Sequence, residues 1–92
     1  MKARPVTRDG VVLGYLIECP ACGYGHFFDN RWTFNGDMNR PTFTPSMLVN
    51  GDSRFVTPTT PRCHSFVIDG VIKFLSDCSH SMAGQEAELK DW

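Results

Sequence analysis

The chain has 92 residues, a formal net charge of −1, 41% hydrophobic residues and 21% charged residues. A chain of this size buries a modest core and often depends on a metal or on disulfides, so we expect one stapled domain spanning residues 1–92. The near-neutral charge makes nucleic acid an unlikely partner, since non-specific phosphate binding requires a basic surface. No apolar run approaches the roughly 20 residues that span a bilayer. The N-terminus is polar, without the apolar segment of a secretory signal, so we expect a cytoplasmic protein with no membrane partner.

The first third of the chain predicts short strands joined by turns. Residues 10–19 are rich in β-formers, and Gly14 within this run indicates a bulge or a close approach of another backbone. Two shorter runs, residues 24–28 and 31–34, flank Asp29-Asn30 and are also typical of strands.

The middle of the chain contains two prolines four residues apart, Pro41 and Pro45. Proline cannot donate to a sheet ladder, so residues 40–46 are predicted as an edge strand or an extended surface loop. Residues 47–49 can then pair with a neighbouring strand. In the tail, residues 86–89 fit a brief strand or a single helical turn.

The segment 62–80 predicts the hairpin around which the domain is organised. Asp69-Gly70 separates two β-forming runs and favours a two-residue turn with positive φ. In that register, Cys63 and Cys78 lie one diagonal step apart on the same face. With no long helix in the pattern, we expect an all-β fold, or nearly so: a small zinc-ribbon-like antiparallel β domain with a Cys-bearing C-terminal hairpin.

The cysteines indicate a metal site. The string Cys19-Pro-Ala-Cys22-Gly23 has the form of a metal knuckle, in which backbone N–H groups point at the sulfurs and glycine relieves crowding. In a reducing compartment, four cysteines in a small protein hold metal more often than they form disulfides. Zn²⁺ suits soft thiolates and a tetrahedral ligand set. The preferred ligand set is Cys19, Cys22, Cys63 and Cys78.

The three histidines leave this ligand set open. His80 shares the face of Cys63 if its strand continues that far, and either His80 or His64 can replace one cysteine as a zinc ligand. His64 otherwise faces the opposite side of the strand. His26 alternates with Phe27, which favours a surface or hydrogen-bonded residue.

No catalytic set is evident from spacing alone. A Cys63/His64 nucleophile–base pair is poorly placed, since neighbours on a strand face opposite ways. A hydrolytic zinc needs an open coordination position and a nearby general base, and nothing in the sequence fixes Asp77 or Asp37 in that place. The interpretation therefore leans toward a protein that is not an enzyme.

Several unusual strings occur in one order along nearly the whole chain. They are Cys19-Pro-x-Cys-Gly-x-x-His26, Trp32-x-Phe-Asn-Gly-Asp37, Arg40-Pro-Thr-Phe-x-Pro-Ser46, Cys63-His-Ser-Phe-Val, Asp69-Gly-x-Ile-x-Phe-Leu-Ser-Asp-Cys78 and His80-x-x-Ala-Gly84. In these strings the chain resembles a group of small phage- and prophage-encoded proteins of unknown function, some of which carry the label ammonia monooxygenase. It more loosely resembles zinc-binding proteins encoded beside bacterial ubiquitin-like conjugation genes. The resemblance implies a metal-bound domain in a bacterial host cell and does not imply a reaction.

Three functions remain open at this point. The first is a zinc-binding phage or prophage accessory protein that acts as an interaction module for a host or phage protein. The second is a small metal-dependent hydrolase acting through His80 or His64 and Asp77, and the third is a nucleic-acid-binding zinc ribbon. The region from Trp32 to Ser46 is either a set of core aromatics and proline-shaped loops or part of a surface that binds a partner. On the second interpretation, the residues to test first are Trp32, Arg40, Phe43 and Phe55.

Overall fold

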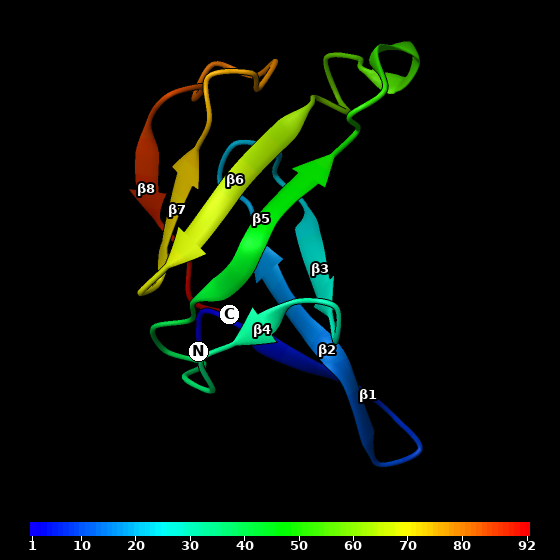
Figure 1. The fold of residues 1–92 in the computed structure, drawn as a ribbon, viewed down its shortest axis with the longest axis vertical. Coiled ribbons are helices and arrows are strands. Elements are labelled where there is room, and N and C mark those ends of the chain that lie inside the picture. The colour runs from blue at the N-terminus through cyan, green and yellow to red at the C-terminus, as the bar shows by residue number, and fades with distance from the viewer.

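Two antiparallel sheets make up the computed structural model, which describes residues 1–92 (Figure 1). The first sheet has the order β1-β2-β3 and the second has the order β4-β5-β6-β7-β8. The strands of the first sheet are β1 (Arg4–Arg8), β2 (Val11–Glu18) and β3 (Gly25–Asp29). The strands of the second sheet are β4 (Thr33–Phe34), β5 (Phe43–Val49), β6 (Cys63–Ile68), β7 (Val71–Phe74) and β8 (Glu86–Glu88). The predicted all-β class is confirmed.

Helical structure is limited to η1 (Ser53–Phe55), a single 3₁₀ turn in the loop between β5 and β6. No helix therefore has the length and apolar character needed to cross a bilayer.

The predicted Asp69-Gly70 hairpin is confirmed. Both turn residues have positive φ, 50° and 78°, and Ile68 pairs with Val71 across the turn. The ladder keeps this register up to Ser65 and Phe74. Beyond Phe74 the chain leaves the ladder, but Cys63 and Cys78 still come together, with their sulfurs within 4.8 Å of each other.

A second Asp-Gly hairpin joins β1 to β2, and the sequence reasoning missed it. Asp9 and Gly10 have φ of 52° and 78°, and Arg8 pairs with Val11. The signal was the same Asp-Gly dipeptide as at the later turn. The residues of β1 before it are largely polar, so they do not form the apolar run that predicts a strand. In β2 the expectation for Gly14 holds, because a Cβ there would collide with the carbonyl oxygen of Phe28.

The prediction of an edge strand or surface loop for residues 40–46 holds only in part, because β5 lies inside its sheet at Phe43 and Thr44 and has no strand partner on one side beyond them. It pairs with β4 on one side and with β6 on the other (Figure 1). Proline is tolerated there because the ladder with β6 shifts register between Phe43 and Met47, leaving a bulge around Pro45. Since β4 pairs only with Phe43 and Thr44, the rest of β5 has no strand partner on that side.

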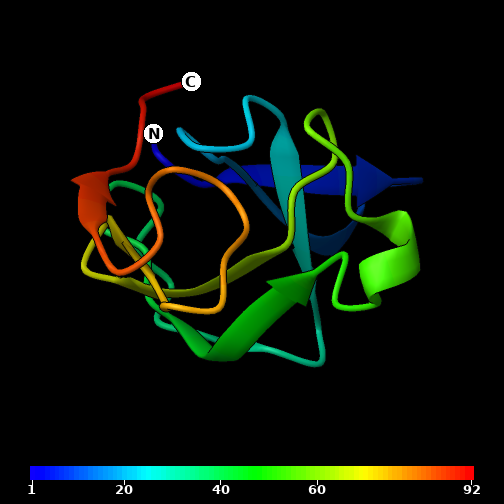
Figure 2. The ribbon, with the colours of Figure 1, turned by 90° about the horizontal axis from the view of Figure 1, so that it is seen from above.

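The core lies between the two sheets, which Figure 2 shows as separate layers. The ring of Phe43 stacks between two aromatic rings, with centroid distances of 4.2 Å to Phe28 and 4.9 Å to Phe34. Trp32 is half-buried and meets the edge of Phe28 at 5.4 Å. Phe43 and Trp32 are therefore core aromatics, whereas Phe55 is 62% exposed.

The C-terminal residue is folded back onto the body. The indole nitrogen of Trp92 donates a hydrogen bond to the carbonyl of Leu16 at 3.1 Å, and the guanidinium of Arg4 lies 5.0 Å from its ring. This contact ties the tail to the first sheet.

We predict that Phe43→Ala lowers the free energy of unfolding by about 3–5 kcal/mol, because it removes the central ring of the aromatic stack and leaves a cavity. Urea denaturation measures this loss. Phe55→Ala is the matched control and should change stability by less than about 0.5 kcal/mol, because its ring is largely in solvent. Similar losses in the two variants would contradict the assignment of Phe43 to the core.

Candidate functional site

The turn between β2 and β3 forms a knuckle around the first two cysteines. The amide of Gly23 donates to the carbonyl of Cys19 at 2.9 Å, and the amide of Cys22 lies 3.5 Å from the Cys19 sulfur. Gly23 has a φ of 76°, which a glycine adopts without strain. The turn therefore holds both thiols on the same side, as the sequence pattern predicted.

Two residues from elsewhere complete a cluster with this knuckle. Cys63 comes from the start of β6, and its sulfur lies 3.9 Å from that of Cys19. His26 points inward from β3. The ligand atoms of Cys19, Cys22, His26 and Cys63 all lie within 4.8 Å of one another, so the cluster can hold a metal ion.

The burial of the cluster supports this role. Cys19 and Cys63 have no exposed surface, and His26 is 3% exposed with no hydrogen-bond partner for its Nε2 atom. A buried polar atom without a partner is costly unless something else satisfies it, and a cation would do so. The expectation that His26 is a surface or hydrogen-bonded residue was wrong, because its strand parity turns it toward the core with Phe28.

The thiols interact strongly with one another. A hydrogen bond from the Cys63 thiol lowers the pKa of Cys19 to about 4, although burial opposes this shift. Burial, together with the negative charge of Cys19, raises the pKa of Cys22 to about 11. The Cys19 thiolate likewise raises the pKa of Cys63, mainly because it accepts the hydrogen bond of the Cys63 thiol. One thiolate is thus favoured and its neighbours resist ionising, a conflict that a bound cation removes.

The remaining predicted ligands lie outside this four-residue cluster. Cys78 and His80 form a second, overlapping group with Cys63, again with ligand atoms within 4.8 Å of one another. The Cys78 sulfur also lies 3.2 Å from both the amide nitrogen and the carbonyl oxygen of His64. Cys78 therefore supports the main chain of β6, and the His64 ring faces away from both groups.

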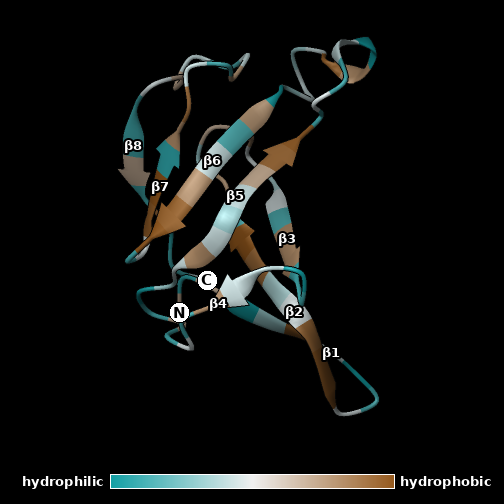
Figure 3. Ribbon diagram, in the orientation of Figure 1, coloured by the Kyte–Doolittle hydropathy of each residue, from teal (hydrophilic) through white to brown (hydrophobic).

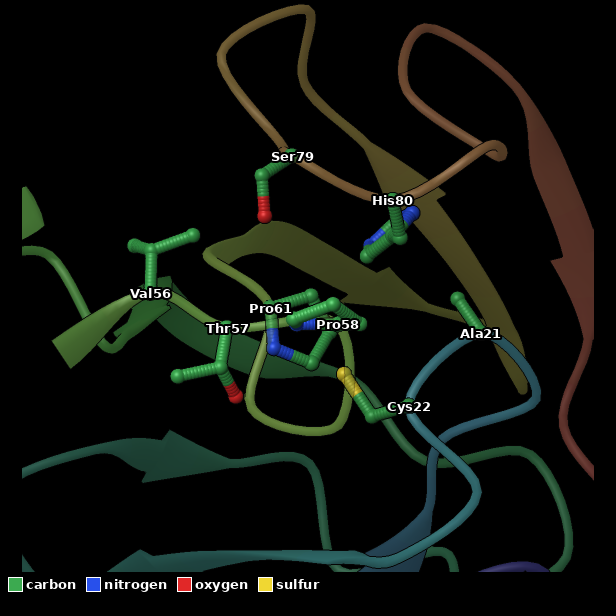
Figure 4. Close-up of a pocket in the computed structure, with 8 residues that line it drawn as sticks. All are labelled: Ala21, Cys22, Val56, Thr57, Pro58, Pro61, Ser79 and His80. Carbon is green, nitrogen blue, oxygen red and sulfur yellow. The ribbon is translucent and has the colours of Figure 1, made fainter.

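A pocket of about 470 Å³ lies against the four-residue cluster. Figure 4 shows the sulfur of Cys22, the ring of His80 and the rings of Pro58 and Pro61 among the groups that line it. Cys22 is the half-buried member of the cluster, so this pocket is the side from which solvent reaches it.

On the opposite face of β6, the His64 ring lies between a hydroxyl and a carboxylate. Its Nε2 atom is 3.1 Å from Oγ of Ser46, and its Nδ1 atom is 3.0 Å from the nearer carboxylate oxygen of Asp77. The carboxylate can only accept a hydrogen bond, so Nδ1 carries the proton and Nε2 is free to accept the proton of the Ser46 hydroxyl. This is the arrangement of an activated serine nucleophile.

Three different elements bring these groups together. Ser46 lies in the bulge of β5, and the indole nitrogen of Trp32 reaches its carbonyl at 3.4 Å. His64 comes from β6, and Asp77 from the turn after β7. Bulges commonly redirect a side chain at functional sites, and here the bulge sets Ser46 diagonally across from His64. We refer to Ser46, His64 and Asp77 as the triad.

The sequence pointed to two of the triad residues and not to the third. His64 and Asp77 were predicted as parts of a metal-dependent hydrolase, whereas Ser46 was predicted only as the end of an edge strand or loop that contains two prolines. The available signal was its place directly after Pro45, since proline in a strand indicates a bulge.

Comparison with protein families gives one match to the chain. Residues 6–75 match the model of a family described as bacterial ubiquitination-like system serine protease (BubE). Neither a curated protein nor a solved structure gave a match. The matched segment contains Ser46 and His64 and the whole four-residue metal-binding cluster, and it ends two residues before Asp77.

We predict that the purified protein carries about one equivalent of a divalent metal held by the four-residue cluster, and that a strong chelator lowers its melting temperature sharply. Structural zinc contributes about 10–16 kcal/mol in small peptides, comparable to the stability of a whole domain. Mass-spectrometric metal analysis and circular dichroism measure both effects.

The histidines provide the matched control for this prediction. His26→Ala should lose the metal, whereas His80→Ala should retain it. If the His80 variant lost the metal and the His26 variant retained it, the metal site would instead be the second group, Cys63, Cys78 and His80. A metal-free protein whose melt is unaffected by the chelator would contradict the metal site altogether.

Proposed function

Because the chain belongs to the BubE family, we propose that it is a serine protease with Ser46 as nucleophile, His64 as general base and Asp77 as the group that orients His64. The observation that carries this proposal is the continuous hydrogen-bonded line from the serine hydroxyl through the imidazole to the carboxylate. The side chains of His64 and Asp77 are 25% and 52% exposed, so the site is open to a substrate.

The chemistry follows from these positions. The Oγ atom of Ser46 attacks the carbonyl carbon of a peptide bond while Nε2 of His64 takes up its proton. The imidazolium, stabilised by the Asp77 carboxylate, then gives that proton to the leaving amine as the C–N bond breaks. A water molecule then attacks the resulting ester on Ser46 while Nε2 of His64 takes up its proton. His64 returns this proton to the Oγ atom of Ser46 as the ester bond breaks.

The order of the three residues along the chain is Ser, His, Asp, and all of them lie between residues 46 and 77. Triads recur on unrelated folds in different chain orders, so geometry identifies them better than order does. Here the triad sits on the outer face of one sheet, with Ser46 and His64 on neighbouring strands.

We propose that the four-residue cluster holds a structural Zn²⁺, the ion that suits three thiolates and one imidazole. Four protein ligands fill a tetrahedral shell and leave no position for a substrate, which is typical of structural zinc. Cys63 would tie the start of β6 to the β2–β3 knuckle, and its neighbour His64 would thereby be fixed on the other face. The residues that would hold the ion are Cys19, Cys22, His26 and Cys63.

The family description also bears on the substrate. It places the family in a bacterial ubiquitination-like system, and we propose that the protein cleaves a protein of such a system. The expected protein partner is then the substrate itself. A phage or prophage origin and a separate interaction role stay predictions.

We predict that Ser46→Ala, His64→Ala and Asp77→Asn each reduce peptide-bond hydrolysis by about 10³-fold or more, since removing one member of a triad disables the others. A fluorophosphonate probe, which phosphonylates an activated serine with loss of fluoride, measures the same defect without knowledge of the substrate. Mass spectrometry of the labelled wild-type protein should place the adduct on Ser46.

Ser53→Ala is the matched control, because Ser53 is an exposed serine in η1 without a histidine partner. It should label at the wild-type rate. Labelling of the wild-type protein at another serine, or undiminished labelling of folded His64→Ala, would contradict the proposed triad.

A further inference from the structure

The edge of β5 beyond Thr44 has no strand partner on the side of β4, and this unpaired part includes the proposed nucleophile Ser46. β4 ends its pairing with β5 at Thr44, while β6 continues to pair with β5 as far as Val49 (Figure 1). We call residues 46–49 on this side the β5 edge.

The main-chain groups of Leu48 point out of this edge. Leu48 lies opposite His64, but the His64 carbonyl accepts from Leu75 at 2.9 Å and its amide lies against the Cys78 sulfur. The backbone of His64 is therefore directed toward β7, so its pair with Leu48 is a non-hydrogen-bonded one. In an antiparallel ladder the N–H and C=O of Leu48 must then face away from β6.

The same edge includes the backbone of Ser46. Its carbonyl points toward β4, since it accepts from the indole nitrogen of Trp32 at 3.4 Å. Ser46 and Leu48 are two residues apart and so direct their backbone groups to the same side. A strand bonded to Leu48 would consequently run directly past Ser46.

The surface around this edge suits the side chains of an unfolded polypeptide. Leu48 is 53% exposed and Phe66 is 39% exposed, and both lie on the outer face of the sheet with His64. Figure 3 shows that β5 changes from a pale middle to an apolar end. Neither of the two pockets in the structure includes a triad residue, so the substrate must be recognised on an open surface.

We propose that polypeptide substrates bind as an extended strand added to the β5 edge, with the N–H and C=O of Leu48 bonded to the substrate main chain beside the scissile bond. Unpaired edge groups are a ready template for such strand addition. This proposal rests on the proposed protease function and specifies its substrate class: unfolded segments, recognised chiefly through their backbone.

Leu48→Pro tests this proposal, because it removes the outward N–H without breaking a bond to β6, and proline is tolerated on a free edge. We expect cleavage of reduced, unfolded casein to fall by at least about tenfold, because strand addition relies on main-chain hydrogen bonds. Leu48→Ala, which keeps the N–H, should cause a much smaller loss. Fluorophosphonate labelling of Ser46 should be unchanged in both variants.

These readouts separate the two proposals. Equal cleavage by folded Leu48→Pro and Leu48→Ala, with normal labelling, would overturn strand addition and leave the triad standing. Absence of labelling and of cleavage in the wild-type protein would overturn the protease function itself.

Amide hydrogen exchange provides a test that requires neither cleavage nor a folded proline variant. In Ser46→Ala protein, excess unfolded casein should slow exchange of the Leu48 amide, because that amide has no partner in the free protein. The amides of β8, at the opposite edge of the same sheet, serve as the control and should be unaffected. Unchanged exchange at Leu48 would overturn the proposal.

Discussion

The alternation of side chains along β6 is the constraint on which the rest of the site depends. Cys63 faces the interior and meets the β2–β3 knuckle, while the next residue, His64, faces outward between Ser46 and Asp77. A strand has a side-chain period of two, so one backbone segment supplies a thiol to the buried cluster on one face and an imidazole to the triad on the other. The buried cluster and the exposed triad are thus mechanically joined although no side chain belongs to both.

The bulge in β5 is the second requirement. A ladder continued without a bulge from the Phe43–Val67 pair would place Pro45 opposite Ser65, where its missing N–H breaks a hydrogen bond, and Ser46 directly opposite His64. The register shift between Phe43 and Met47 removes the conflict at Pro45 and leaves Ser46 diagonally across from His64, still within hydrogen-bond distance of its ring. Trp32 then holds the bulge on the β4 side of β5. Its ring packs on Phe28, and its indole nitrogen contacts the Ser46 carbonyl.

Local signals in the sequence were sufficient for most of the fold. Asp69-Gly70 predicted the hairpin and its register, and Cys19-Pro-Ala-Cys22 predicted the knuckle, because turn chemistry depends on a few neighbouring residues. The same logic was available at Asp9-Gly10 but was not applied to the polar strand before it. Residues 40–46 were assigned to an edge strand or a surface loop because an isolated sequence does not reveal which strands lie on either side, and β4 pairs with Phe43 and Thr44 of this segment.

The site was harder to predict because it depends on long-range register. His26 becomes part of the cluster only through the pairing of β2 with β3, and Ser46 meets His64 only through the pairing of β5 with β6. The spacing of residues along the sequence does not predict either of these contacts. The cysteines were found because thiols in a small domain have few other uses, whereas a serine has many.

Under the proposed protease function, the shallow setting of the triad has a consequence for which proteins would be left intact. Tightly folded proteins keep their own backbone groups paired, so they have no loose stretch to lay alongside Leu48. Susceptibility would then be governed by how readily a target releases a tail or an unstructured junction. The protein would thus distinguish unstructured segments from folded ones by the local order of the target. Such selection requires no deep cavity around Ser46.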